Sequence, residues 1–207
     1  MNGRKLFAGA CEFVAGAATI EVLPKTTLPE IAFVGRSNVG KSSLMNALTG
    51  RRTLARVSHT PGATKQINFF RLGDACMLVD LPGYGYARAS KSLTAEWQRL
   101  IYAYLRGRPN LARTLLLIDA RRGIMQPDRD AMQLLDESAV SYAGVLTKAD
   151  ELSEEELQAV QSLTQTELSR HPASHPQLFA TSAHKSCGLD TLRDHIAALA
   201  EAWGSRV

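Results

Sequence analysis

The sequence predicts an α/β fold in which a mostly parallel sheet carries helices on both faces. Six short apolar runs alternate with segments whose apolar residues have helical spacing, as in strands joined by crossover helices. Polar, glycine-containing segments directly follow several of these runs, and ligands of such sheets bind beyond the carboxyl ends of the strands. At 207 residues, with 45% hydrophobic and 21% charged residues, the chain has the composition of one globular domain.

Each apolar run has the length of a buried strand and is bounded by polar residues or glycine. The six runs are Ile31–Gly35, Ile67–Leu72, Cys76–Asp80, Thr114–Ala120, Ala143–Thr147 and Leu178–Thr181. Gly73 and Asp74 form a turn signal between the second and third runs, so we expect these two strands to pair as an antiparallel hairpin.

Four segments have the pattern of helices. One runs from Ser42 to a stop at Gly50, one begins at a Ser92 cap, one opens with the capping box Ser153–Glu156, and the last spans about 188–203. We expect their apolar stripes in the core, at Trp97, Leu100, Ile101, Leu105, Leu192, Ile196 and Leu199. With no repeat or linker, the sequence predicts a single domain over 29–203, with an N-terminal extension, 1–28, packed on it.

The positive charge is concentrated in one part of the chain. The net charge is only +4, but no carboxylate lies between Glu30 and Asp74, a window that contains Arg36, Lys41, Arg51, Arg52, Arg56, Lys65 and Arg71. Two interpretations stay open: these cations surround one polyanionic ligand, or they also contact nucleic acid.

Cysteine usage and the N-terminus both indicate a cytoplasmic protein. Cys11, Cys76 and Cys187 are scattered without metal-ligand spacing, as expected of incidental reduced thiols. Glu12 interrupts the apolar N-terminal stretch too early for a signal peptide, and no run reaches the length of a membrane span. We therefore expect a soluble, cytoplasmic chain.

The segment "GRSNVGKS" carries the first chemistry-bearing motif, a phosphate-binding loop. It matches GxxxxGK[ST], follows a predicted strand and opens a predicted helix, which is the context that the motif requires. Its backbone N–H groups can surround phosphate oxygens, Lys41 can reach the β- and γ-phosphates, and Ser42 can bind Mg²⁺. The predicted nucleotide contacts are Gly35, Arg36, Ser37, Asn38, Val39, Gly40, Lys41 and Ser42.

The segment Asp80–Gly83, "DLPG", ends the third predicted strand. Asp80 can hold a water bound to Mg²⁺, and Gly83 can offer its N–H to the γ-phosphate, with Leu81 and Pro82 between them. Taken alone, the same four residues are typical of a β-turn with proline at its second position. The phosphate-binding loop favours the nucleotide interpretation.

The segment Thr147–Asp150, "TKAD", ends the fifth predicted strand and predicts the base. Guanine presents two adjacent donors, N1–H and the N2 amine, which the carboxylate of Asp150 can accept together, whereas adenine presents an acceptor at N1. Lys148 can lie along the base and brace the phosphate-binding loop. Alone, Asp150 could simply begin an acidic helix face.

The segment after the sixth strand is the last candidate, with Thr181, Ser182 and Ala183. It can place N–H groups near the guanine O6, or form an ordinary loop exit.

The polar segment between the two phosphate motifs contains the candidates for a second Mg²⁺ ligand. Thr60 and Thr64 both lie there, and a threonine ligand beside the γ-phosphate would order this segment only with triphosphate. The residues alone leave both threonines open.

Together these motifs resemble a known family. The order GRSNVGKS, PGAT, DLPGYGYA, TKAD and TSA is similar to that of translation-factor-type GTPases of the TrmE-Era-EngA-EngB-Septin-like class, and the chain from about Val22 to Leu199 closely resembles the EngB (YsxC/YihA) family. The resemblance implies a P-loop NTPase domain with a six-stranded sheet, and a cytoplasmic bacterial GTPase of large ribosomal subunit assembly, linked to cell division and septation. It assigns the second Mg²⁺ ligand to Thr64, within the contacts Gly62, Ala63, Thr64, Lys65 and Gln66.

Three positions qualify what the resemblance implies. Ala183 stands where many relatives have serine, which leaves its role open. Tyr84 follows Gly83 where small GTPases place a water-orienting glutamine, so we expect slow intrinsic hydrolysis. Asn38 stands where related GTPases use asparagine to coordinate K⁺ between phosphates; it can do so here or merely structure the loop. Three residues are expected to act on the phosphates during hydrolysis: Lys41, Asn38 and Gly83.

The sequence also favours a particular partner. Arg51, Arg52, Arg56 and Lys65 lie in or beside the segment expected to sense the γ-phosphate, and Arg88 and Lys91 follow "DLPG". GTP can occupy few of these cations, so the others are expected to face the RNA and protein of the large ribosomal subunit, with the chain acting as a monomer. The alternatives are a constitutive RNA- or ribosome-binding module with structural GTP and a P-loop kinase, against which "TKAD" argues.

Overall fold

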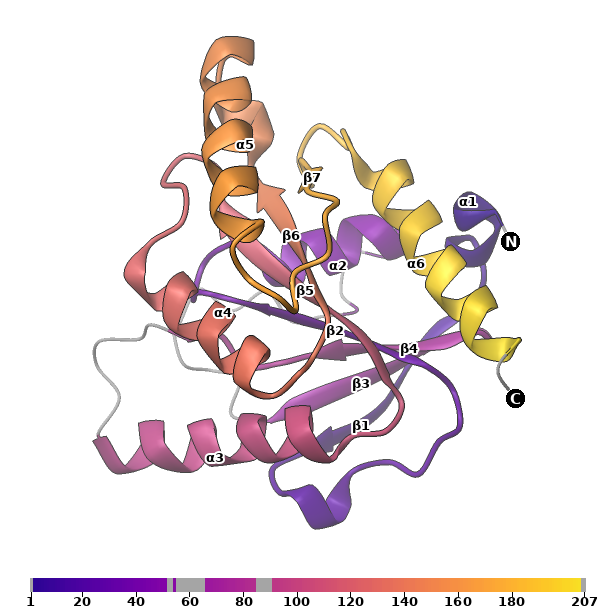
Figure 1. Ribbon diagram of the computed structural model, residues 1–207. Coiled ribbons are helices and arrows are strands. Elements are labelled where there is room, and N and C mark those ends of the chain that lie inside the picture. Colours follow the sequence, from indigo (N-terminus) through magenta and orange to yellow (C-terminus); the bar gives the residue numbers. More distant parts are fainter. Residues whose placement is uncertain (1, 52–53, 55–65, 85–90, 206–207) are drawn as a thin grey trace.

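The fold is one seven-stranded sheet between two layers of helices (Figure 1). The structure, a computed structural model, describes residues 2–51, 54, 66–84 and 91–205, and for 91–98 the backbone alone. The strands are β1 (Cys11–Ala17), β2 (Glu30–Gly35), β3 (Ile67–Leu72), β4 (Cys76–Asp80), β5 (Leu111–Asp119), β6 (Tyr142–Thr147) and β7 (Phe179–Ala180). Their order in the sheet is β1-β3-β4-β2-β5-β6-β7.

All six predicted strands are present, and β3 and β4 form the predicted antiparallel hairpin. The predicted strand number of six was wrong, because β1 adds a seventh strand at the edge, antiparallel to β3. This strand has no clean alternation of apolar and polar residues: Phe13 and Val14 are 60% and 45% exposed, and a bulge separates Phe13 from Ala15. A strand at the edge of a sheet can keep side chains exposed. The apolar pattern by which a strand is predicted from sequence is therefore weak in β1.

Two hydrophobic cores lie on the two faces of the sheet. Helices α1 (Gly3–Phe7), α2 (Lys41–Thr49) and α6 (Leu189–Gly204) contribute to one core. Helices α3 (Lys91–Gly107), α4 (Gln126–Glu137) and α5 (Glu154–Leu168) contribute to the other. Two short 3₁₀ turns, η1 (Ile20–Val22) and η2 (Ala149–Glu151), join these elements. The doubly covered sheet confirms the predicted fold class.

The four predicted helices are present as α2, α3, α5 and α6. Gly50 ends α2 with a left-handed φ of 64°, and Ser153 and Glu156 form the predicted capping box of α5. Leu100, Ile101 and Leu105 of α3 are buried as predicted, while the side chain of Trp97 lies outside the described part. The sequence analysis missed the short α1 and also α4, which has only two buried apolar side chains.

The N-terminal segment is built into the sheet and one helix layer. The Gly3 N–H donates to Asp194 of α6 at 2.8 Å, Arg4 pairs with Asp190 at 2.5 Å, and β1 extends the sheet. The boundary between 28 and 29 stays a prediction.

The three cysteines are free thiols. Cys11 and Cys76 are buried, and Cys187 is exposed.

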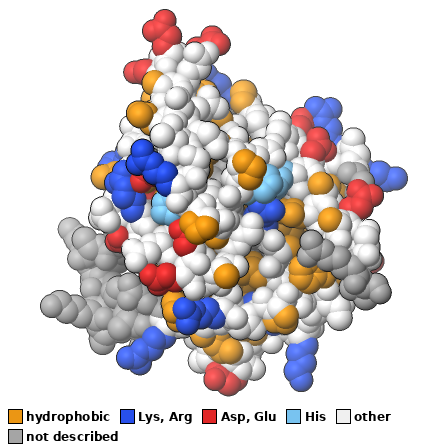
Figure 2. Space-filling model, in the orientation of Figure 1, with side chains coloured by type: hydrophobic (Ala, Val, Ile, Leu, Met, Phe, Trp, Pro, Cys, Tyr) orange, Lys and Arg blue, Asp and Glu red, His pale blue; other side chains and the backbone are white. Residues whose placement is uncertain are grey.

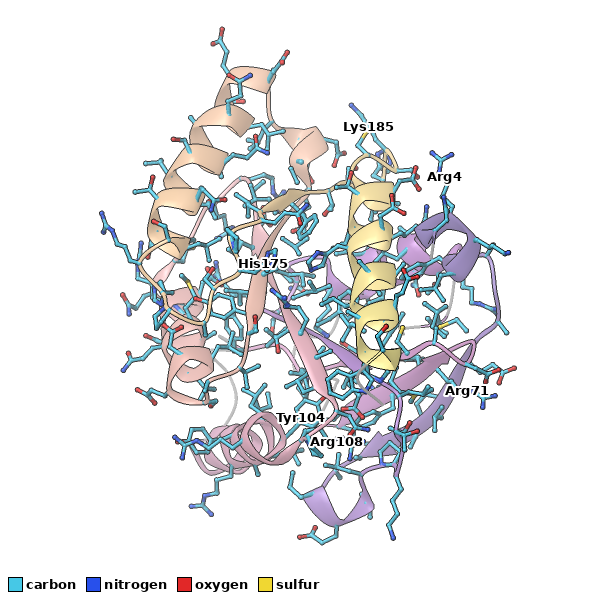
Figure 3. All side chains as sticks on the ribbon, turned by 45° about the vertical axis from the view of Figure 1, so that its right-hand side comes forward. Arg4, Arg71, Tyr104, Arg108, His175 and Lys185 are labelled. Carbon is cyan, nitrogen blue, oxygen red and sulfur yellow. The ribbon has the colours of Figure 1, made fainter. Side chains whose placement is uncertain are left out.

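Charged side chains of both signs lie on the surface. On the face in Figure 2, acidic and basic side chains are interspersed, with one gathering of Lys and Arg beside the lower end of α5. Arg71 points outward from β3 toward Glu12, at 3.6 Å, and Asp74, at 4.0 Å (Figure 3). Arg71, one of the cations of the acid-free window, therefore faces acidic neighbours on β1 and in the turn after β3. Among the described residues, no helix is long and apolar enough to cross a membrane.

Candidate nucleotide-binding site

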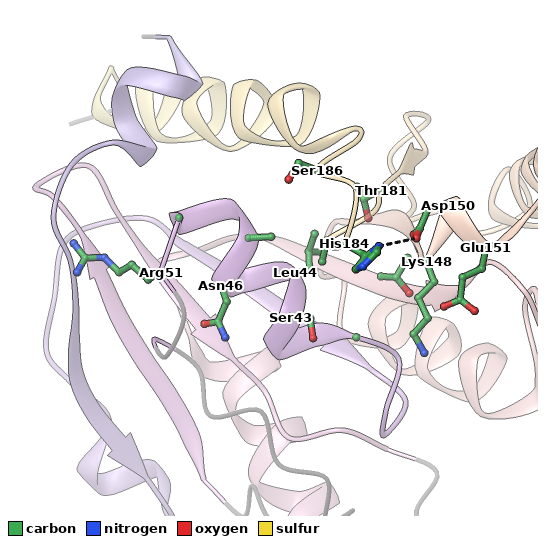
Figure 4. A pocket seen from close by; sticks show the side chains of 15 residues that line it. Ser43, Leu44, Asn46, Arg51, Lys148, Asp150, Glu151, Thr181, His184 and Ser186 are labelled. Carbon is green, nitrogen blue, oxygen red and sulfur yellow. Dashed lines mark ion pairs between the residues drawn. The ribbon is translucent and has the colours of Figure 1, made fainter.

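The predicted motifs meet at the carboxyl ends of the parallel strands. A cleft of about 1100 Å³ opens there between α2 and the segments that follow β6 and β7. Figure 4 shows Lys148, Asp150 and Thr181 toward one end of this cleft and Arg51 at the other. Six predicted site residues line it: Gly40, Thr147, Lys148, Asp150, Thr181 and Ala183.

The phosphate-binding loop leaves β2 at Gly35 and enters α2 at Lys41. Asn38 and Gly40 have left-handed φ values of 65° and 101°, which turn the backbone between strand and helix. Asparagine tolerates this conformation better than most residues, which gives Asn38 a structural reason to occupy the loop. The first N–H groups of α2 have no partner within the helix, as an anion-binding helix terminus requires. Val39 is buried beneath the loop and anchors it.

Lys41 and Asp80 come together in the interior of the site. The Nζ of Lys41 donates to Oδ1 of Asp80, and the two side chains are 10% and 5% exposed. The hydroxyl of Ser42 follows at the next position and is partly exposed. Carboxylate and hydroxyl oxygens are the donors that Mg²⁺ takes in sites shared with phosphates, so these residues fit that ion. Within the described ranges, no group of three or more His, Cys, Asp and Glu side chains could hold a metal by itself.

The "DLPG" segment packs directly against the phosphate-binding loop. Leu81 and Pro82 are buried, and the Leu81 N–H donates to the Phe33 carbonyl at 3.0 Å. A Cβ added to Gly83 would lie 3.2 Å from both Gly35 O and Ser37 N, so a larger residue would press the two segments apart. Glycine therefore fits this close approach of backbone to backbone without a shift of the loop.

The "TKAD" segment braces the phosphate-binding loop from the other side. The Thr147 hydroxyl donates to the Val39 carbonyl at 2.6 Å, and Lys148 Nζ donates to the Asn38 carbonyl at 2.9 Å. Lys148 has a left-handed φ of 56° and also pairs with Asp119 at 2.9 Å. The contact expected between Lys148 and the loop is thus present.

Asp150 is held as an anion beside the predicted O6-binding segment. A hydrogen bond from Ser182 is the main cause that lowers the pKa of Asp150. Thr181 and Ser182 are fully buried, and the Ala149 N–H donates to the Thr181 carbonyl at 3.1 Å, which joins the two segments. Asp150 therefore presents an ionised acceptor to the cleft, as recognition of two adjacent donors requires.

Asp119 and His184 belong to this site and were not predicted from the sequence. Asp119 ends β5 as Asp80 ends β4, a signal that could have found it; burial would raise its pKa, but hydrogen bonds from Arg121 and Lys148 lower it to about 2. His184 lines the cleft with its Nδ1 3.7 Å from Oδ2 of Asp150 (Figure 4). No sequence pattern distinguishes this histidine.

Several predicted residues do not lie in the described part of this cleft. Gln66 lies next to Gly16 of β1 and is not among the residues that line the cleft. Also described, but not among the residues that line the cleft, are Gly35, Arg36, Ser37, Asn38, Val39, Lys41, Ser42, Asp80, Leu81, Pro82, Gly83 and Ser182. Other predicted residues lie outside the described part of the chain: Arg52, Arg56, Thr60, Gly62, Ala63, Thr64, Lys65 and Arg88, together with the side chain of Lys91.

Comparison with known proteins agrees with this geometry. The family model described as 50S ribosome-binding GTPase matches residues 30–148. The "Probable GTP-binding protein EngB" of Rhodospirillum rubrum is 55% identical over 203 residues, which cover 96% of this chain and 88% of that protein. Its namesake from Cereibacter sphaeroides is 52% identical over 197 residues, covering 95% and 91%.

Solved structures share the fold. The crystal structure of a probable GTP-binding protein engB has a TM-score of 0.66 at 22% identity, covering 84% of this chain and 99% of that one. Era in complex with MgGDPNP and nucleotides 1506–1542 of 16S ribosomal RNA has a TM-score of 0.66 at 23% identity, covering 84% and 57%. On the family model and the close relatives, the chain belongs to the EngB family of GTP-binding proteins and is a GTPase.

Proposed function

We propose that this GTPase is a nucleotide-dependent switch in assembly of the large ribosomal subunit. It acts in the cytoplasm as a monomer, binds the subunit or its precursor in the GTP state, and is needed for normal cell division and septation. The observation that carries the proposal is the match of residues 30–148, which contain the phosphate-binding loop and "DLPG", to a family described as 50S ribosome-binding.

The direction of Tyr84 supports a slow intrinsic rate. Water attack on the γ-phosphate needs a group that orients the water, and a phenol offers one oxygen with a single proton where an amide offers a separate donor and acceptor. The Tyr84 hydroxyl donates to Asp128 of α4 at 2.8 Å and is committed there. We therefore infer that the ribosome or a cation completes the site, with K⁺ held by Asn38 as the candidate cation.

Magnesium would be held by the hydroxyls of Ser42 and Thr64, with Asp80 holding a metal-bound water. When bound, the ion neutralises charge between the β- and γ-phosphates. Lys41 and Asp80 neutralise each other in the interior of this structure. With nucleotide bound, Lys41 would contact the phosphates instead of Asp80. Coupling of Thr64 to the γ-phosphate is the step that makes the segment before β3 sensitive to the nucleotide.

The basic surface proposed for RNA begins at Arg51. Arg51 is exposed at the end of α2 and also lines the nucleotide cleft, so it lies between the nucleotide and the surface. Arg108, by contrast, is only 13% exposed and is paired with Glu30, so it is not part of this surface.

Cosedimentation with large ribosomal subunits tests the switch. Binding is measured with GDP, with a non-hydrolysable GTP analogue and without nucleotide, at two salt concentrations. We expect binding with the GTP analogue alone, weakened by salt because each phosphate contact releases counterions. Equal binding in all three conditions would instead support a constitutive ribosome-binding module with structural GTP.

Two variants sharpen this experiment. Arg51→Glu should weaken binding to the subunit more than it weakens GTP binding, which it can also affect because Arg51 lines the cleft, while Arg71→Glu, a matched reversal on β3, should change neither. Asp150→Asn should bind the subunit with a xanthine nucleotide analogue and not with the guanine analogue. If it binds without regard to nucleotide, the proposed dependence on nucleotide state is wrong.

A further inference from the structure

The residue after "DLPG" joins three parts of the molecule. The Tyr84 N–H donates to the Gly35 carbonyl at 3.2 Å, and the Tyr84 carbonyl accepts from the Ser37 N–H at 3.0 Å. These bonds form a parallel bridge between Tyr84 and Arg36. Because Gly83 is the preceding residue, and an added Cβ on it would lie 3.2 Å from the Ser37 nitrogen, the position of Gly83 beside the loop depends on where Tyr84 is held.

The side chain of Tyr84 is held by α4. Its hydroxyl donates to Oδ1 of Asp128 at 2.8 Å, while Oδ2 of Asp128 accepts from the Met125 N–H at 2.9 Å. Asp128 is 1% exposed, so its two oxygens are shared between the cap of α4 and the phenol. A residue that only capped the helix would need just one of them.

The charges around this pair fit a donor phenol and an acceptor carboxylate. Burial, followed by the charge of Asp128, raises the pKa of Tyr84 well above its ordinary value, so the phenol keeps its proton. Burial also raises the pKa of Asp128, against the opposing effects of the Met125 and Tyr84 hydrogen bonds and of Arg36 and Arg129. Arg36, from the phosphate-binding loop, also donates to the Met125 sulfur at 2.8 Å.

We propose that Asp128 is a positioning residue for GTP hydrolysis. By holding the Tyr84 hydroxyl, it fixes Gly83 against the phosphate-binding loop and ties the first turn of α4 to the phosphate side of the site. The two residues are 44 positions apart in the sequence, so this link exists only through the fold. A partner that moves α4 would then change the rate of hydrolysis without touching the nucleotide.

Single-turnover GTP hydrolysis and GDP affinity test the proposal in Tyr84→Phe, Asp128→Asn and the double variant. Tyr84→Phe removes only the hydroxyl and leaves the α4 cap intact. We expect hydrolysis to fall about fivefold to tenfold in each, the loss of one hydrogen bond, with GDP affinity changed by less than about twofold. Asp128→Asn leaves one acceptor oxygen for two donors, the Tyr84 hydroxyl and the Met125 N–H, and so weakens the link that Tyr84→Phe removes. Because both changes act on the same hydrogen bond, the double variant should lose no more than the larger of the two single losses.

Matched controls separate this role from a structural one. Asp130→Asn changes an exposed carboxylate on the same helix, and Tyr102→Phe removes a phenol hydroxyl from α3; both should leave hydrolysis unchanged.

The pH dependence of hydrolysis gives a second test. The wild-type rate should fall at acid pH as Asp128 takes a proton, and Asp128→Asn should flatten the acid side of the pH–rate profile. An unchanged rate in Tyr84→Phe, or losses that multiply in the double variant, would overturn the proposal.

Discussion

A buried ion pair at the amino end of β2 makes a strong prediction about stability. Glu30 is fully buried, and its carboxylate accepts from Arg108 Nε at 3.0 and 2.9 Å, from Arg108 Nη2 at 2.5 Å and from the Tyr104 hydroxyl at 2.8 Å. Arg108 also donates to the Pro24 carbonyl at 2.6 Å, and Figure 3 shows Tyr104 and Arg108 close together. The pair thus joins α3, β2 and the segment before β2.

Removing one partner leaves a buried charge without compensation. Arg108→Ala leaves Glu30 with only the Tyr104 hydroxyl, and breaking a buried pair in this way costs about 3–5 kcal/mol of unfolding free energy. That is a large part of the roughly 5–15 kcal/mol by which a domain is stable. For a chain of this size the Tm should fall by about 6–20 °C.

Thermal and urea denaturation at one fixed GDP concentration measure this effect, because a bound ligand raises apparent stability. Arg106→Ala is the matched control: Arg106 is exposed, lies 4.3 Å above the Tyr102 ring and should cost less than about 1 kcal/mol. Replacing Glu30 and Arg108 together by methionine should recover part of the loss. Equal midpoints for Arg108→Ala and Arg106→Ala would refute the reasoning.

Four further predictions concern the nucleotide and pH. Asp150→Asn should exchange guanine for xanthine preference, since xanthine carries an acceptor oxygen at C2; titrations with GTP and XTP decide it, and unchanged GTP affinity would reject the assignment. Lys41→Ala should weaken GTP and GDP binding by about 10- to 100-fold, the value of a hydrogen bond to a charged group, as measured by fluorescent-nucleotide titration; an unaltered Kd would contradict a phosphate contact. Replacing K⁺ by Na⁺ should slow hydrolysis in wild type and not in Asn38→Ala; a rate indifferent to the cation would leave Asn38 as a residue that shapes the loop. Burial, with Arg113 and His175, lowers the pKa of His195 from 6.5 to about 4, so stability present above pH 6.5 should be lost as the pH falls toward 4, and urea midpoints at pH 7 and 5 should differ less in His195→Phe than in wild type.

The local features of the fold could be predicted from the sequence. The phosphate-binding loop was recognisable because glycine, lysine and serine at fixed spacing are what a strand-to-helix turn around phosphates requires. The hairpin of β3 and β4 followed from a two-residue turn signal, and Gly50 and Ser153 marked helix ends by their own backbone and side-chain chemistry. Each of these features depends on residues close together along the chain.

Other features were decided only by the tertiary structure. In the part of the chain that the structure describes, β1 lies at the edge of the sheet and α4 buries few apolar side chains, so neither element has a strong hydrophobic pattern in the sequence. Asp119 could be related to Lys148, and Asp128 to Tyr84, only once separate strands and helices had been placed side by side. A side chain's partner across the fold depends on the packing of whole elements, which no short stretch of sequence contains.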